Sequence, residues 1–397
     1  MTAFGKLLIA LAIWVSGAPV ASQQTFVVDS LMRPGAHFAT VSAALWAARD
    51  GDTVQVRSSP QMYFEAGTVS KALTIEGIDA GYGRPFVRWL GIQVGYLTTN
   101  QQVICKNIDS QSVIVMDCSG LVHFEDCGAR FPWPSLNAQI WYIRRCAQVS
   151  MVRCLAYGSG GWPGVYADGS HLTLNHCELR GAEPVTGPPR IASAEALRLV
   201  NGVASLSQCI LAGGSGNILA FSPPSPAIAA TNSRLIVAGD ENCVLASGTS
   251  GPLPPIDGTS VTLDLDPRVR VTSSDGVPVP PAPSVVVRRH AICRVDATMV
   301  PRGGMRDVVV STGGGEPGFA VLLLGLPDTP MPVANGYWYL GGFPPQLIMV
   351  TRTSRERLAT WKTTIPSANA WGGFRVAFQV VSLGARVEPG GVIHVAL

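Results

Sequence analysis

The chain has 397 residues, of which only 14% are charged, and it contains 43 glycines and 30 prolines. This composition favours many turns over long helices, and the length leaves room for one large domain and a smaller one. The formal net charge of +3 is small and no basic run is interleaved with aromatic residues, so we expect no nucleic-acid partner.

Residues 1–22 have the features of an export signal peptide. Lys6 supplies a positive charge, Leu7 to Val15 form an apolar run, and Val20-Ala21-Ser22 resembles a cleavage site. A membrane anchor is the alternative, but the run is shorter than the roughly 20 residues that a span needs. We expect a secreted, periplasmic or cell-surface protein with no transmembrane segment after cleavage.

Residues 38–48 have the apolar spacing of a short amphipathic helix, and residues 50–56 change at once to a strand pattern. A helix at this point can cover the open end of a stack of coils, which would otherwise expose its core and a backbone edge. We therefore expect an N-terminal capping helix.

From Val113 to Gly213 the chain repeats one pattern: apolar, polar, apolar, two polar residues, cysteine. The cysteines that end it are Cys127, Cys154, Cys177 and Cys209, which are 27, 23 and 32 residues apart. A related pattern precedes each one, so every coil should contain at least two short strands joined by a polar corner. Such an uneven period is typical of a solenoid with insertions in one loop per coil.

The polar pairs interrupt the alternation of a strand and therefore mark the corners. Asn175, Asp168 and Asn201 suit such corners because Asn and Asp tolerate left-handed backbone geometry. Inward positions of successive coils should lie above one another at about the 4.8 Å spacing of strands. We expect one buried column of Phe124, Met151, Leu174 and Leu206.

The nine cysteines lack the short paired spacings of a zinc site. An exported protein can form disulfides, but parallel inward side chains such as those of Cys127 and Cys154 can miss the dihedral angle that a bridge needs. We interpret the cysteines mainly as small buried apolar residues.

The N-terminal region resembles the pectin-lyase-like superfamily of right-handed parallel β-helices. The matching elements are Thr40-Val41 with Ala44, Ala47 and Ala48, then Gly51-Asp52-Thr53-Val54, Met62-Tyr63-Phe64-Glu65, and Leu73-Thr74-Ile75-Glu76-Gly77. The resemblance covers about 26–271 and implies the fold, not an activity. The catalytic motifs of the pectin methylesterase-like, polygalacturonase-like and pectate-lyase-like members have no match here.

The charged corner residues have two interpretations. The first corner should hold Asp117, Arg145, Asp168 and Asn201, and the second Asp126, Arg153, His176 and Gln208. Opposite charges alternate between coils, as in surface pairs worth up to about 1 kcal/mol each. The alternative is catalysis, for which Asp117, Asp126, Asp168 and Arg153 are weak candidates, with a carboxylate pair among Asp117, Glu125, Asp126 and Asp168.

Loops that follow the cysteine-ended strands arise at the same position of each coil and should gather along one edge. They carry the binding candidates Trp133, Tyr157, Trp162, Arg130, Arg180 and Arg190. Aromatic and guanidinium groups together suit sugar rings bearing carboxylate or sulfate. The alternative is that these aromatic side chains pack on their own coils.

The prolines of 277–283 suggest an extended linker, which would divide a β-helix at 23–276 from a second domain at 284–397. Short alternating runs after 284 are typical of a β-sandwich. This part loosely resembles C-terminal sandwich modules of secreted bacterial proteins, through Ile365-Pro366 and 374–379.

The sequence therefore predicts an all-β exported protein with a carbohydrate-binding or structural surface role, whose partner is a polysaccharide or cell-surface glycan. The alternative is a polysaccharide lyase or glycoside hydrolase acting on an acidic polysaccharide. No metal or cofactor is expected, apart from calcium if the protein is a lyase.

Overall fold

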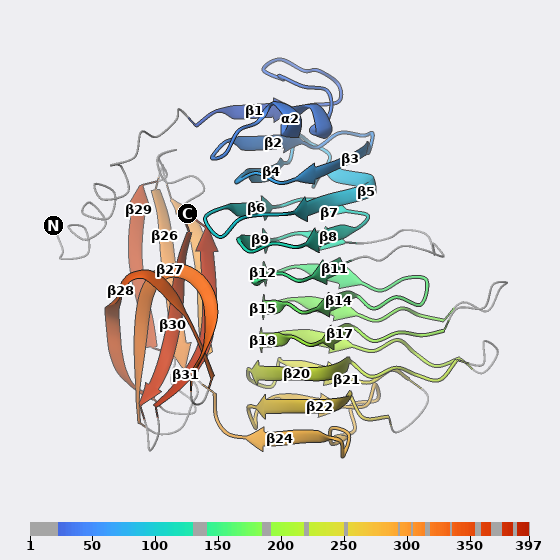
Figure 1. Ribbon diagram of the computed structural model, residues 1–397, viewed down its shortest axis with the longest axis vertical. Coiled ribbons are helices and arrows are strands. Elements are labelled where there is room, and N and C mark those ends of the chain that lie inside the picture. The colour runs from blue at the N-terminus through green and yellow to red at the C-terminus, as the bar shows by residue number, and fades with distance from the viewer. Residues whose placement is uncertain are drawn as a thin grey trace.

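The computed structural model describes residues 23–129, 141–184, 192–217, 222–249, 253–292, 294–302, 305–313, 318–333, 336–353, 359–366, 375–383 and 387–396. The expected signal peptide, residues 1–22, lies outside these ranges. Figure 1 shows a tall stack of short strands beside a group of longer strands.

Parallel strands between residues 25 and 289 form three ladders, which we name by their order within a coil. The lead ladder consists of β3 (Tyr63–Val69), β5 (Phe86–Gly95), β8 (Val113–Met116), β11 (Trp141–Arg144), β14 (Val165–Asp168) and β17 (Leu197–Val200). The middle ladder consists of β1 (Thr25–Val28), β2 (Thr53–Arg57), β4 (Thr74–Ile78), β6 (Gln102–Lys106), β9 (Leu121–Glu125), β12 (Gln148–Val152), β15 (His171–Asn175), β18 (Val203–Ser207) and β24 (Val285–Arg289).

The trailing ladder consists of β7 (Asp109–Ser110), β10 (Gly128–Ala129), β13 (Leu155–Tyr157), β16 (Glu178–Arg180), β19 (Ile210–Ala212), β21 (Val244–Ala246) and β23 (Arg270–Thr272). Two longer strands, β20 (Ile228–Ala238) and β22 (Ile256–Leu265), run through both the lead and the middle ladders. This stacking of parallel strands is compatible with a β-helix.

The corners are made by residues with positive φ. At the corner between the lead and middle ladders these are Asp117, Arg145, Gly169 and Asn201, and at the corner between the middle and trailing ladders Asp126, Arg153, His176 and Gln208. The prediction for Asn201 is therefore confirmed. Asp168 and Asn175 were wrongly assigned, because each is the last residue of its strand and the next residue makes the turn.

The inward positions form the predicted column. Met151 lies opposite Phe124 on one side and Leu174 on the other, Leu174 lies opposite Leu206, and all four side chains are fully buried. Each pair buries apolar surface that a single coil would leave exposed to water, so the coils stabilise one another.

The cysteines of the described residues are free thiols, and all eight are buried. Six of them directly follow a corner residue, and their thiol groups donate to the carbonyl oxygen two residues earlier. These bonds are Cys118 to Met116, Cys127 to Glu125, Cys146 to Arg144, Cys154 to Val152, Cys177 to Asn175, and Cys209 to Ser207, at 3.2–3.4 Å. Ser170 makes the equivalent bond to Asp168 at 2.8 Å. The position needs a small side chain with a donor, which cysteine supplies along with apolar character.

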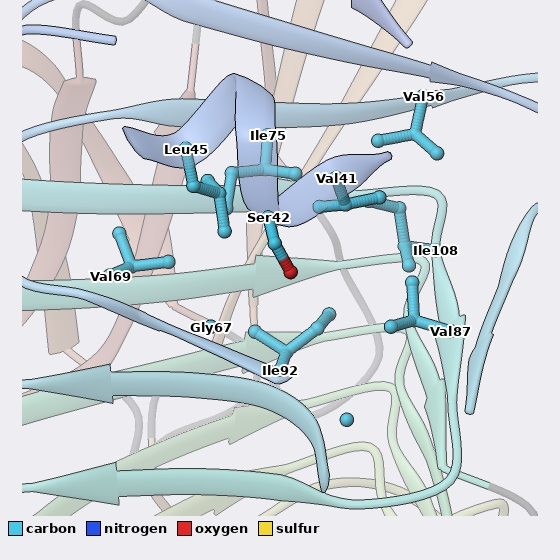
Figure 2. Close-up of a pocket in the computed structure, with 11 residues that line it drawn as sticks. Val41, Ser42, Leu45, Val56, Gly67, Val69, Ile75, Val87, Ile92 and Ile108 are labelled. Carbon is cyan, nitrogen blue, oxygen red and sulfur yellow. The ribbon is translucent and has the colours of Figure 1, made fainter. Parts of the chain in front are cut away.

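The helix α2 (Val41–Ala47) begins after Thr40, whose hydroxyl oxygen accepts a bond from the Ala43 backbone at 3.3 Å. It packs against β1, β2 and β3. Figure 2 shows Val41 and Leu45 of the helix around a small cavity with side chains of the first coils. The cavity measures about 20 Å³ and is almost entirely apolar.

The proline-rich stretch 277–283 does not separate two domains. The backbone N–H of Val279 donates to Val271, and that of Ala282 to Ile256. After it, β24 still pairs in parallel with β22, so the ladders continue to Arg289. The expected linker therefore belongs to the last coil of the stack.

The remaining strands form two antiparallel sheets. One contains β25 (Arg294–Arg302), β26 (Met305–Gly313) and β29 (Ala359–Pro366), and the other β28 (Gly336–Thr353), β27 (Gly318–Val333), β30 (Arg375–Leu383) and β31 (Val387–Ala396). Trp361 and Phe378 bring the two sheets into contact, with ring centroids 5.9 Å apart. The runs 337–340 and 346–351 form one long strand, β28, because β-bulges let the pairing continue between them.

We expect Leu174→Asp to destabilise the folded protein by more than about 3 kcal/mol, since it buries a charge without a partner in the apolar column. The matched control is Ile210→Asp, at an outward position that is 46% exposed, which should change stability by no more than about 0.5 kcal/mol. Thermal and urea unfolding measure both. Equal effects of the two changes would contradict the assigned inward and outward faces.

Candidate functional site

Two stacked tyrosines stand out on the outer side of the lead ladder. Tyr142 and Tyr166 lie opposite each other in β11 and β14. Side chains alternate along a strand, and Trp141 and Ile143 on either side of Tyr142 are fully buried, so the two tyrosines point outward. Their ring centroids are 5.3 Å apart with an interplanar angle of 8°. Because each ring covers a face of the other, the pair offers ring edges and hydroxyl groups to a ligand.

Charged groups surround this pair. Arg198 lies opposite Tyr166 in the next coil, and its Nε donates to Glu195. Arg144 lies opposite Asp168, with 3.9 Å between Nε and the nearer carboxylate oxygen. Both arginine side chains are 44% exposed. We call Tyr142, Arg144, Tyr166, Asp168 and Arg198 together the tyrosine face.

Burial, followed by the neighbouring Asp168 carboxylate, raises the pKa of Tyr166 above its ordinary value. The hydroxyl of Tyr166 therefore remains a hydrogen-bond donor throughout the neutral range. With guanidinium groups on both sides, the tyrosine face can donate several hydrogen bonds to an anionic or hydroxyl-bearing ligand.

Three side chains of the trailing ladder form a second cluster. Tyr157 lies opposite Arg180, whose guanidinium carbon is 5.5 Å from the centre of the tyrosine ring. Glu178 accepts a bond from Arg180 at 2.8 Å and one from the Tyr157 hydroxyl at 3.3 Å. Two of the predicted binding residues, Tyr157 and Arg180, are thus brought together.

The loop from Tyr157 to β14 connects this cluster with the tyrosine face. It turns at Gly160 and Gly161, both with positive φ, and carries Trp162, which is partly exposed. The other predicted binding residues, Arg130, Trp133 and Arg190, lie outside the described residues.

The candidate catalytic residues lie on different corners. Asp117 accepts two bonds from Arg145, at 2.5 and 2.9 Å, at the corner between the lead and middle ladders. Asp126 accepts two from Arg153, at 3.0 and 2.8 Å, at the corner between the middle and trailing ladders. These pairs connect neighbouring coils, as the ladder interpretation expected. Asp168 belongs to the tyrosine face and is 3.5 Å from the Asn201 amide.

Sequence reasoning gave Glu125 little weight, although it lies in a compact charged group. One carboxylate oxygen accepts a bond from Arg153 at 2.5 Å, and the other is 3.5 Å from Lys106 and 3.9 Å from His123. Burial alone would raise the pKa of Glu125, but the neighbouring His123, Lys106 and Arg153 outweigh it, so this pKa lies well below its ordinary value.

Within the described ranges, no three His, Cys, Asp or Glu side chains come together as metal ligands would. In the same part of the chain, no helix has the length and apolar character of a membrane span.

Comparisons with protein-family models, with curated proteins and with solved structures found no match for this chain.

The tyrosine pair was missed by sequence reasoning, although a signal was present. Tyr142 stands three residues before the corner residue Arg145, and Tyr166 three residues before Gly169. Aligning the coils on their corners would have put the two tyrosines in one row.

Glu125 should give the protein a measurable acid sensitivity. Its folded-state pKa lies below the ordinary value of about 4.3. The ionised carboxylate therefore stabilises the fold above that pH, and this stabilisation is lost as the pH falls through the lower folded-state pKa. We expect Glu125→Gln to cost about 1–3 kcal/mol at pH 7, with a difference from wild type that shrinks below about pH 4.

Urea unfolding between pH 3 and 8 measures this difference. The exposed Glu241, changed to Gln, is the matched control and should show little difference at any pH. A Glu125→Gln difference that stays constant across the range would contradict the role of the charged group.

Proposed function

We propose that this protein is exported and binds an acidic polysaccharide or cell-surface glycan along the tyrosine face and the adjoining loop edge. The observation that carries the proposal is the pair of stacked tyrosines flanked by Arg144 and Arg198 on a regular outer surface. Guanidinium groups bind carboxylate and sulfate in a bidentate manner, and tyrosine hydroxyls donate to sugar oxygens.

The site extends across several coils, which suits a chain rather than a compact ligand. The Tyr157, Glu178 and Arg180 cluster lies on the adjoining trailing ladder, and the loop with Trp162 connects the two. Successive coils are spaced at about 4.8 Å. A polymer lying along the stack can therefore contact several coils at once, which adds binding energy without a deep pocket.

The arrangement of the carboxylates favours binding over catalysis. Asp117 and Asp126 each form a two-bond pair with an arginine, and they lie at two different corners. General acid or base catalysis needs groups that converge on one reacting atom. The described residues support a surface that holds a glycan and leaves it unchanged.

The proposal includes an architecture of the pectin-lyase-like kind. The parallel ladders support a right-handed β-helix, and the contacts of α2 with the first strands support a capping role for this helix. The two antiparallel sheets, joined at Trp361 and Phe378, support a C-terminal β-sandwich. The export signal expected in residues 1–22 supports a location outside the cytoplasm.

Removing the two tyrosine hydroxyls tests the site with little change in shape. We expect the double variant Tyr142→Phe with Tyr166→Phe to bind polygalacturonate or alginate at least tenfold more weakly, because two hydrogen bonds to the ligand are lost. Arg144→Gln should also weaken binding, and the loss of affinity should be larger in low salt than in high salt, because salt screens exposed charges. Calorimetric titration measures both.

Tyr82→Phe is the matched control, since Tyr82 is 53% exposed and lies in the first coils. It should leave the affinity unchanged, and all variants should keep the wild-type melting temperature. Unchanged binding by the tyrosine and Arg144 variants would exclude this surface as the site.

A further inference from the structure

The outer side of the middle ladder is covered. All five residues of β12 and all five of β18 are buried, so both faces of these strands are hidden from solvent. The outward side chains at the centre are Ser150, Thr173 and Ser205, which are 1%, 4% and 8% exposed. A strand at the surface of an isolated stack would leave these positions open.

The covered side chains are polar. We define the covered face as six buried polar outward side chains of these three strands: Gln148, Ser150, Thr173, Asn175, Ser205 and Ser207. A seventh polar outward residue, His171 of β15, is only partly buried. Its border contains the apolar outward residues Ile104, Val152 and Val203 and also His123, which is fully buried opposite Ser150. The centre is polar, whereas an ordinary protein interface has an apolar centre.

Several of these polar groups are buried without a partner. Ser150 Oγ, Ser207 Oγ and both amide atoms of Asn175 have no hydrogen-bond partner among the described residues. A buried donor or acceptor left unpaired is unfavourable by about 1–3 kcal/mol. A permanent interface between domains would therefore be expected to place apolar or paired side chains here.

The C-terminal sheets cover this face. Strand β31 lies against β15, and Figure 1 shows the antiparallel sheets on the side of the stack that carries β9, β12, β15 and β18. Among the described strands, none of the antiparallel sheets pairs with a strand of the stack, and the chain connects the two parts after β24, which ends at Arg289. The two parts can thus separate without breaking a ladder.

We infer that the covered face is a second binding surface, for a neutral polyhydroxyl chain such as a β-linked glucan, to which the C-terminal sheets control access. Hydroxyl and amide groups both donate and accept, as sugar hydroxyls do. No Asp, Glu, Lys or Arg side chain lies among the outward positions of β12, β15 and β18, which separates this ligand class from the acidic glycan of the tyrosine face. This inference rests on the proposed function only in assuming that the ligand is a glycan.

The opening can be measured in the full-length chain by thiol labelling. Ser150→Cys places a thiol at the centre of the covered face with little change in size, and Ser205→Cys is a second, independent probe. Iodoacetamide labelling followed by peptide mass spectrometry reports each site. The native Cys154, fully buried in the core, is the internal negative control, and Ile210→Cys, at an exposed position, is the positive control.

We expect Cys154 to be labelled at least tenfold more slowly than the introduced thiols. Adding cellohexaose or laminarihexaose should slow labelling of the introduced thiols at least fivefold, while Ile210→Cys is unaffected. In calorimetric titration, Asn175→Leu should lower the affinity for the hexasaccharide at least tenfold. The affinity of the same variant for polygalacturonate should not change.

Introduced thiols that react no faster than Cys154 would show a permanently closed interface and overturn the inference. Rapid labelling that neither hexasaccharide slows would overturn the ligand class. Thiol labelling tests only the covered face, whereas the Tyr142 and Tyr166 variants test only the tyrosine face. Failure of this inference can therefore be distinguished from failure of the proposed function.

Discussion

The whole stack depends on how each coil turns its corners. A residue with positive φ makes the turn, and its backbone N–H donates to the last strand residue of the next coil, as Asp117 does to Arg144. A cysteine or serine then follows and donates to the same kind of carbonyl, as Cys146 does to Arg144. Both lone pairs of that oxygen are used, which offsets the roughly 1–2 kcal/mol that left-handed geometry costs a residue with a side chain.

Fixed corners also fix which side chains face inward. Because the strands between corners are only four or five residues long, one residue of slip would turn Met151 and Leu174 outward. The corners prevent this slip, and the same positions therefore lie above one another from coil to coil. This one constraint produces the stacked tyrosines, the pairs of arginine and carboxylate groups, and the rows of cysteines.

Two outer surfaces of the same stack have different surroundings. The lead ladder presents Tyr142, Arg144 and Tyr166 to solvent, whereas Ser150 and Asn175 of the middle ladder are buried beneath the C-terminal sheets. Strand geometry is the same in both cases. The difference comes from where the antiparallel sheets lie, and it turns one repeated scaffold into an open surface and a covered one.

The sequence alone determined the coil repeat, the buried column through Leu174, the left-handed corner at Asn201 and the corner partners of Asp117 and Asp126, because these depend on residue spacing within and between neighbouring coils. It did not reveal that 277–283 belongs to the last coil, since this stretch is held by backbone bonds from Val279 to Val271 and from Ala282 to Ile256, and neither bond follows from the residue spacing of the coils. Nor could it reveal the cover over Ser150, because contact between β15 and β31 joins segments more than two hundred residues apart. Such contacts leave no periodic pattern in the chain, so only the tertiary structure decides them.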